Sequence, residues 1–224
     1  MFENIKNGID FFIRNKTKFS RKNFVEKDEK LLFRNYLENL YTYDILEQCL
    51  KKYPSDTAKI LDIGSKNWFY AKGEYSFFKS FVQTPCLDGV EIDAFRLYSN
   101  LYSRYESAKF YTKNLKNTNY IAGDLLSISD TYDYIIWFLP FVTIEPLKYW
   151  GLPEKYFMPE KLLYHAFSLL KNGGQMLIVN QGEKEASAQK LLFEKLNIKY
   201  TEKGIVKSDF LEYKNDRYAF VTDR

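Results

Sequence analysis

The stretch AKILDIGSKNWF, residues Ala58–Phe69, decides the fold. Its apolar run predicts a buried strand over Lys59–Ile63, and Gly64 follows as the residue best suited to a tight turn. Asp62 lies where this strand ends. A buried strand that ends at an acidic residue and a glycine is typical of the carboxyl edge of a parallel sheet, where the backbone can approach a ligand closely.

Beyond this stretch, predicted strands and helices alternate, which indicates a parallel sheet with helices on both faces. The last two strands, near Ile198–Lys207 and Arg217–Thr222, have no helix between them and predict an antiparallel pair. The expected fold is therefore α/β: a Rossmann-like, seven-stranded, mostly parallel sheet with an antiparallel C-terminal strand pair. The other expected strands are Leu87–Ile92, Tyr120–Ala122 (favoured over Lys109–Tyr111), Tyr132–Phe138 and Gln175–Asn180, and the expected helices lie within Tyr70–Phe81 and over Ala94–Glu106, Pro159–Leu170 and Lys184–Leu196.

Residues 1–57 are expected to form a helical extension in front of an α/β domain at residues 58–224. Apolar residues recur at helical spacing near the N-terminus and again from about Asp28 to Tyr53, where Pro54 ends the pattern. A basic cluster, Arg14–Lys22, follows the first helical pattern. It could dock on RNA or another acidic partner, but a solvated helix and linker is the simpler interpretation.

The composition is that of an ordinary globular protein. The chain has 224 residues, a net charge of +4 and 46% hydrophobic residues, so it can bury a sizeable core and does not demand a nucleic-acid partner. Cys49 and Cys86 lack the spacing of a zinc or redox site, which favours a reduced, cytoplasmic protein. His165 is the single histidine, so no metal site is expected. No apolar run reaches the length of about 20 residues that a membrane span needs.

Four strand ends carry residues that could contact a ligand. Asp62 could hold a turn or a ligand ammonium group, and Gly64 lets the backbone come close. Glu91, at the end of GVEID, could accept hydrogen bonds from two ribose hydroxyls. Asp124 could accept one from the amine of a base. Residues 138–141, FLPF, form an apolar corner beside the expected reaction centre.

In this order and spacing, the chain resembles the class I S-adenosylmethionine-dependent methyltransferases. ILDIGS is similar to the family's first motif, GVEID to its second, AGDLL to its third and YDYIIWFLPF to its fourth, and LLKNGGQMLIV resembles the start of its fifth strand. The resemblance implies S-adenosylmethionine as cofactor and S-adenosylhomocysteine (SAH) as product. It places Gly64 and Ser65 against the methionine part, Glu91 on the ribose, Ile92 and Asp124 on the adenine, and Trp137 and Phe138 on the methyl-transfer side. The candidate cofactor-binding residues are Asp62, Gly64, Ser65, Glu91, Ile92, Asp124, Leu125, Trp137 and Phe138.

The chain departs from the family pattern in two motifs. The first motif usually carries further glycines, but here Lys66 and Trp68 could crowd the cofactor or close over it. The fourth motif lacks the Asn-Pro-Pro-Tyr that often accompanies methylation of exocyclic or amide nitrogens, which disfavours DNA adenine and protein glutamine as acceptors. A small-molecule acceptor is expected, because the net charge is mild and no nucleic-acid-binding module is evident in the sequence. Its candidate binding residues are Pro140, Phe141, Tyr149 and Trp150, and no catalytic base is evident.

Other functions stay open at this point. A degenerate glycine loop could leave a non-catalytic binding or cofactor-sensing protein, and the Arg14–Lys22 cluster would suit an RNA methyltransferase. A nicotinamide-dependent dehydrogenase is disfavoured, because its G-x-G-x-x-G fingerprint would need glycine where Lys66 and Phe69 stand.

Overall fold

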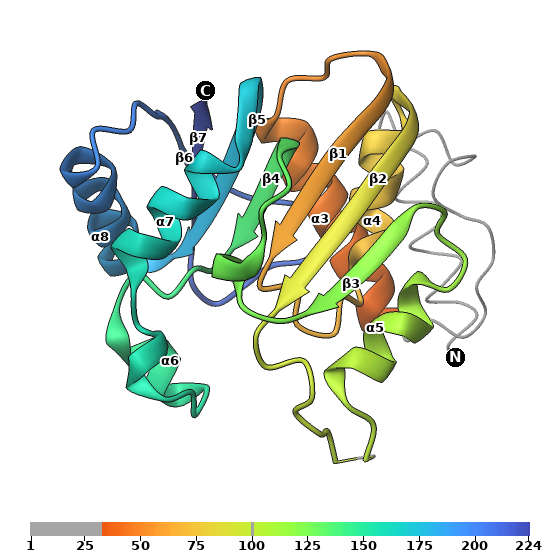
Figure 1. The fold of residues 1–224 in the computed structure, drawn as a ribbon, viewed down its shortest axis with the longest axis horizontal. Coiled ribbons are helices and arrows are strands. Elements are labelled where there is room, and N and C mark those ends of the chain that lie inside the picture. Colours follow the sequence, from red (N-terminus) through yellow and green to blue (C-terminus); the bar gives the residue numbers. More distant parts are fainter. Residues whose placement is uncertain (1–32, 100) are drawn as a thin grey trace. The chain divides into compact units, whose positions relative to one another are not determined.

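The computed structural model describes residues 33–99 and 101–224, and they form a seven-stranded sheet with helices on both faces (Figure 1). The strand order is β3-β2-β1-β4-β5-β7-β6. Neighbours from β3 to β5 pair in parallel, whereas β7 is antiparallel to both β5 and β6. The predicted Rossmann-like α/β fold is confirmed. The strands are β1 Ser55–Ile63, β2 Val82–Glu91, β3 Thr118–Ala122, β4 Tyr132–Phe138, β5 Leu170–Gln181, β6 Thr201–Val206 and β7 Arg217–Asp223.

Successive side chains of each strand point to opposite faces of the sheet, and they pack in two separate hydrophobic cores. Ile60 of β1 packs in the layer under α3 and α4, while its neighbour Leu61 packs in the layer under α7 and α8. Both cores are closed by aromatic side chains, such as Phe77 on one face and Phe193 on the other. The helices are α3 Phe33–Cys49, α4 Ala71–Lys79, α5 Arg104–Thr112, α6 Ile144–Tyr149, α7 Pro159–Ser168 and α8 Gly182–Lys195, with short 3-10 turns η1 Leu125–Ser127 and η2 Glu154–Tyr156.

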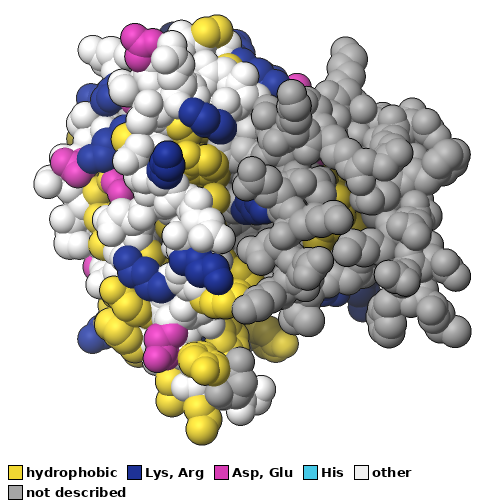
Figure 2. Space-filling view, turned by 90° about the vertical axis from the view of Figure 1, so that its right-hand side faces the viewer, with side chains coloured by type: hydrophobic (Ala, Val, Ile, Leu, Met, Phe, Trp, Pro, Cys, Tyr) yellow, Lys and Arg dark blue, Asp and Glu magenta, His cyan; other side chains and the backbone are white. Residues whose placement is uncertain are grey.

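The helix predicted over residues 94–106 is wrong, because α5 begins only at Arg104. Ser103 starts it with a capping box, in which its hydroxyl accepts the Glu106 N–H while the Glu106 carboxylate accepts the Ser103 N–H. The described residues before it form a loop in which several apolar side chains face solvent, with Phe95 71% and Leu101 78% exposed, although Ala94 is buried. This loop lies at the bottom of Figure 1, and Figure 2 shows exposed hydrophobic side chains at the same end of the molecule. Their helical spacing therefore does not mark a buried face.

Helices α3 and α4 lie close together on one face of the sheet. Asn39 on α3 donates its side-chain amide to the Phe69 carbonyl at 2.8 Å and accepts the Gly73 N–H at 2.8 Å. A Cβ atom on Gly73 would lie 2.3 Å from the Asn39 carbonyl oxygen, so glycine permits this approach. The contact places the N-terminal half of α3 beside the carboxyl edge of the sheet.

Residues 1–32, which include the predicted Arg14–Lys22 docking cluster, lie outside the described residues. Helix α3 belongs to the same compact unit as the sheet. Within the described part of the chain, no helix has the combination of length and apolar character that crossing a membrane requires.

Candidate functional site

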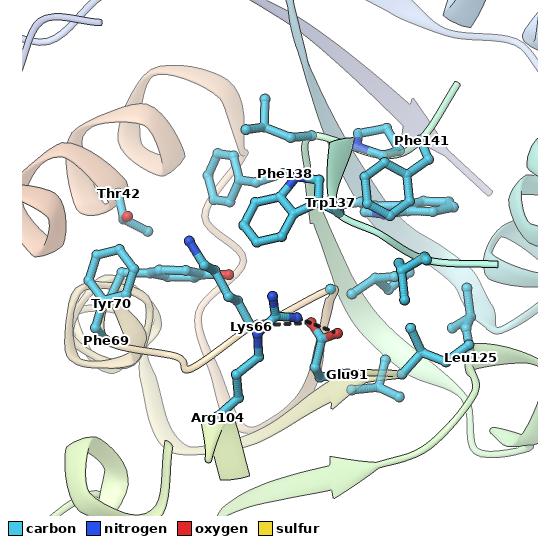
Figure 3. A pocket seen from close by; sticks show the side chains of 18 of the residues that line it. Thr42, Lys66, Phe69, Tyr70, Glu91, Arg104, Leu125, Trp137, Phe138 and Phe141 are labelled. Carbon is cyan, nitrogen blue, oxygen red and sulfur yellow. Dashed lines mark hydrogen bonds and ion pairs between the residues drawn. The ribbon is translucent and has the colours of Figure 1, made fainter. Parts of the chain in front are cut away.

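A cavity of about 440 Å³ lies at the carboxyl edge of the parallel strands. Its walls come from the ends of β1, β2 and β4, from the turn after β3, from α3, and from the segments around α6 and before β7. This is the edge at which open α/β sheets bind ligands. In Figure 3 the Lys66 side chain lies between the Glu91–Arg104 pair and Tyr70, below Trp137 and Phe138.

The turn after β1 holds three residues with left-handed backbone conformations. Gly64 has φ +74, Lys66 has φ 56 and Trp68 has φ 48. The N–H groups of Gly64 and Ser65 both donate to the Val90 carbonyl, at 2.9 and 3.2 Å, which ties the turn to β2. For residues other than glycine this conformation costs roughly 1–2 kcal/mol each. Tertiary contacts must therefore hold the turn in place of the missing glycines.

Trp68 supplies one of these contacts from inside the core. Its indole is fully buried, and the indole N–H donates to Glu74 Oε2 at 2.8 Å. The ring lies against Gly89 of β2, where an added Cβ would come within 2.9 Å of three ring atoms. Trp68 therefore points away from the cavity and does not crowd it.

Lys66, in contrast, extends into the cavity. Its backbone carbonyl accepts the Tyr120 hydroxyl, and its backbone N–H donates to Glu91 Oε2 at 2.9 Å. Its ammonium group lies 4.8 Å from the centre of the Trp150 ring. Burial, and secondly the nearby Arg104 guanidinium, lowers the pKa of the Lys66 ammonium below its ordinary value.

Glu91 is the best-held carboxylate in the cavity. Its Oε1 atom accepts the Asp93 N–H at 2.8 Å and Arg104 Nη1 at 3.3 Å, and Oε2 accepts the Lys66 N–H. A carboxylate offers about four acceptor positions. Three are occupied here, so one remains for a ligand. The Arg104 contact is the longest of the three, so it is the easiest to replace with a second hydrogen bond from a ligand.

Trp150 covers this part of the cavity from the segment after α6. Besides Lys66, its ring faces the Arg104 guanidinium at 5.1 Å. Trp150 thus makes two cation–π contacts, each worth about 0.5–1 kcal/mol when exposed to solvent. The contact joins the α6 segment to the turn after β1 and to α5.

Asp62 lies beneath the cavity as a fully buried carboxyl group. Its Oδ2 atom accepts the Tyr70 hydroxyl at 2.9 Å, while Oδ1 has no hydrogen-bond partner among the described residues. Burial raises the pKa of Asp62 to about 8, against the opposing effect of the Tyr70 hydrogen bond. Asp62 is therefore largely protonated at neutral pH. Glu74 is also fully buried, and burial shifts its pKa in the same direction.

Most of the candidate residues derived from the sequence line this one cavity. Asp62 and Ser65 are instead fully buried and do not line the cavity. Tyr149 also lies outside it, with 89% of its surface exposed. The candidates that line the cavity are Gly64, Glu91, Ile92, Asp124, Leu125, Trp137, Phe138, Pro140, Phe141 and Trp150.

A second group of lining residues was not foreseen from the sequence. Arg34, Glu38, Tyr41 and Thr42 form one face of α3, and their spacing of four, three and one residues is the signal that could have identified them. Arg217, at the start of β7, gave no such signal. Lys66 and Leu139, which belong to the first-motif turn and the FLPF corner singled out in the sequence, also line the cavity. The remaining lining residues are Ile63, Phe69, Tyr70, Val90, Arg104, Gly123, Leu152, Tyr156, Leu162 and Tyr213.

Comparisons with known proteins support the fold. No protein-family model matches the sequence, and no curated protein matches it significantly. Among solved structures, the plantazolicin methyltransferase BpumL in complex with SAH is 18% identical, with 91% of this chain and 93% of that chain covered and a TM-score of 0.50. A SAM-dependent methyltransferase from Aquifex aeolicus is 14% identical, with 94% of each chain covered and a TM-score of 0.53.

A third similar structure is the partner protein of the Haloferax volcanii Trm112 methyltransferase activator, seen in complex with that activator. It is 11% identical, with 85% of this chain and 94% of that chain covered and a TM-score of 0.54. Together these structures show that the chain has the Rossmann-like fold of the class I S-adenosylmethionine-dependent methyltransferases.

Proposed function

We propose that this chain transfers a methyl group from S-adenosylmethionine to a small-molecule acceptor. One observation carries the proposal. A single cavity reaches the Gly64 turn and the Glu91 carboxylate at one end, and the apolar corner at Phe138–Phe141 at the other. Binding pockets of this kind combine apolar walls with a few placed polar groups.

The lining residues fit the proposed cofactor. Glu91 has an open acceptor position for a ribose hydroxyl, and Ile92 and Leu125 offer apolar surface to a base beside it. Asp124 uses Oδ1 to accept the Leu126 N–H at 2.9 Å, which leaves Oδ2 for an exocyclic amine. The Gly64 turn leaves open space where a side chain would stand.

The cofactor would supply an activated methyl group on a sulfonium. The residues of this chain would supply alignment and a dry environment, which suffice when the acceptor is already nucleophilic. Trp137, Phe138 and Tyr70 provide that apolar surround, with the Tyr70 and Phe138 rings edge-to-face at 6.3 Å. No lining residue needs to act as a base for this chemistry.

Calorimetric titration with SAH tests the cofactor site. We expect micromolar-range binding to the wild-type protein and a loss of about four- to fifteenfold in Ile92→Ala, because about one or two buried methylene equivalents are removed from the base contact. Leu191→Ala is the matched control, because Leu191 is an exposed leucine on α8 outside the cavity. Ile92 is preferable to Glu91 as a target, because the Glu91 carboxylate also holds the backbone of the turn.

Two other outcomes would redirect the assignment. Absence of SAH binding at millimolar ligand by a folded protein would reject the methyltransferase proposal. Tight SAH binding without methyl transfer to any of a broad acceptor panel would favour the cofactor-sensing alternative.

A further inference from the structure

We infer that the acceptor is a ring-bearing carboxylate, bound through Arg217 at the end of the cavity remote from Glu91. The inference rests on the proposed function, because it assigns this end of the same cavity to the acceptor. Arg217 begins β7, two strands beyond β4, whereas Glu91 and Asp124 follow β2 and β3 on the other side of β1. The strand order therefore separates the two ends of the cavity.

Arg217 is part of a compact polar cluster at this end. Its side chain is largely buried, with the residue 8% exposed, and the guanidinium lies 4.3 Å from the centre of the Tyr213 ring. The Tyr213 hydroxyl donates to Glu38 Oε2, and the Tyr41 and Tyr213 rings pack edge-to-face at 5.1 Å. Arg217, Tyr213, Tyr41 and Glu38 all line the cavity. The cluster is thus held by its own contacts and faces the ligand space.

The Arg217 guanidinium has donors to spare. It has five N–H donors; Nη1 donates to the Asn215 carbonyl at 3.2 Å, and the Tyr41 hydroxyl is a second hydrogen-bond partner. None of the described carboxylates lies within ion-pair distance of it. Glu38, the carboxylate in the cluster, instead accepts Arg34 Nη2 at 3.4 Å and the Tyr213 hydroxyl.

The charges lining the cavity favour an anion at this position. Four cations line it, and two of them, Arg34 and Arg104, are paired with Glu38 and Glu91. Lys66 and Arg217 have no ion pair to a carboxylate in the described part of the chain. The proposed cofactor carries a sulfonium, an ammonium and one carboxylate, so it can neutralise one of these cations and still adds net positive charge. Because Lys66 belongs to the turn beside Gly64, Arg217 is the cation left for the acceptor.

The shape and charge of this end define the chemical class. A single guanidinium matches a planar monoanion, which it can bind through two parallel hydrogen bonds, better than a phosphate dianion. The surrounding walls are aromatic, with Tyr41, Tyr213, Tyr70 and Phe138 all lining the cavity. Rings of this kind favour a flat aromatic partner over a polar aliphatic one.

Three aromatic probes of similar size and different charge test the inference directly: benzoate, benzamide and benzylamine. Their affinities for the wild-type protein are measured by ligand-observed saturation-transfer NMR, with and without SAH. We expect benzoate to bind at least about fivefold more tightly than either other probe, because a charge-assisted bond exceeds a neutral one. Preference for benzylamine would overturn the inference, because it would make Glu38 the group that recognises the ligand.

Substitutions at Arg217 test whether benzoate binds at this residue. Arg217→Gln should weaken benzoate at least about fivefold and leave benzamide unchanged, and Arg217→Lys should lose part of the affinity because it cannot bind in a bidentate manner. Arg224→Gln is the matched control, because Arg224 bonds to the Leu170 carbonyl at the opposite edge of the sheet. Unchanged benzoate affinity in both Arg217 variants would overturn the inference. If Arg217→Gln does not fold, Arg217→Lys and the wild-type probe series still decide it.

The cofactor proposal has its own readout in the same samples. SAH binding with no Arg217-dependent preference for benzoate would reject this inference and leave the methyltransferase proposal standing. Arg217-dependent benzoate binding without SAH binding would do the reverse, and would identify an anion site in a protein with another function.

Discussion

Two glycines near the cavity differ in whether their surroundings would admit a side chain. Gly89 faces the buried Trp68 ring, and an added Cβ would lie 2.9 Å from three of the ring atoms. Gly123 has the Ser127 hydroxyl oxygen as its nearest neighbour, at 3.8 Å, which is an ordinary contact distance. The tryptophan at position 68 therefore makes glycine necessary at position 89, on the neighbouring strand.

Replacement of each glycine by alanine should separate these cases. Gly89→Ala should lower the free energy of unfolding by about 1–3 kcal/mol, because a buried ring cannot move aside without disturbing its hydrogen bond to Glu74. Gly123→Ala should change it by no more than about 0.5 kcal/mol. Chemical denaturation of both variants measures the difference, and equal stabilities would contradict the role assigned to Trp68.

Residues that follow strands could be predicted as site residues, and residues brought in by packing could not. Glu91 and Asp124 both follow parallel strands, so their convergence at one edge follows from the fold alone. Glu38 and Arg217 line the same cavity only because α3 packs beside β7. Lys66 was noticed in the sequence, but its direction into the cavity, unlike that of Trp68, depends on tertiary contacts.

Among the secondary-structure elements, local sequence patterns predicted the strands better than the helices. β4 has the predicted bounds because the run YDYIIWF is rich in aromatic and β-branched residues and stands between the polar pair Asp130-Thr131 and Pro140. The helix expected over residues 94–106 failed because apolar spacing cannot tell a buried helix face from an exposed loop. Ser103 and Glu106 carried the correct start signal, a capping box, three residues apart. Helix α6 is not among the predicted helices, because its six residues are too few for periodicity to identify.

The α3–α4 contact offers a test at this scale. Gly73→Ala would usually stabilise a helix by up to about 1 kcal/mol. Here we expect it to destabilise the protein by about 1–3 kcal/mol, because the new methyl group would overlap the Asn39 carbonyl. Asn39→Ala should also destabilise it, through the lost bonds to Phe69 and Gly73.

The two substitutions should not act independently. Because both disturb the same contact, the loss in the double variant should be smaller than the sum of the single losses. Urea unfolding of the four proteins gives the coupling energy. Full additivity, or a stabilising effect of Gly73→Ala, would show that the helices do not depend on this approach.

At the scale of the whole molecule, the buried carboxyl groups make stability depend on pH. The pKa of Asp62 is raised from its ordinary 3.8 to about 8 in the folded protein. Between these values the folded state keeps a proton that the unfolded chain has lost. The stabilising contribution is therefore complete below about pH 4 and is lost as pH rises toward 8. Glu74 acts in the same direction, because burial raises its pKa as well.

Asp62→Asn should make stability less sensitive to pH. Asparagine can still accept the Tyr70 hydroxyl, but it has no proton to lose. We expect the melting temperature of the wild-type protein to fall more between pH 5.5 and 8.5 than that of Asp62→Asn. The variant should keep part of the pH dependence, because Glu74 still contributes to it. Asp56→Asn, at an exposed carboxylate near the start of β1, is the control and should follow the wild type. Identical slopes for wild type and Asp62→Asn would contradict a buried, protonated Asp62.

The placement of the tryptophans has an optical consequence. The chain has three, of which Trp137 and Trp150 line the cavity, while Trp68 is sealed in the core. Intrinsic fluorescence therefore contains two signals of different origin. Emission from Trp137 and Trp150 would respond to any molecule that enters beside them, and that of Trp68 would change only when the core opens. The protein thus carries its own reporter for ligand entry and a separate one for unfolding, without any added label.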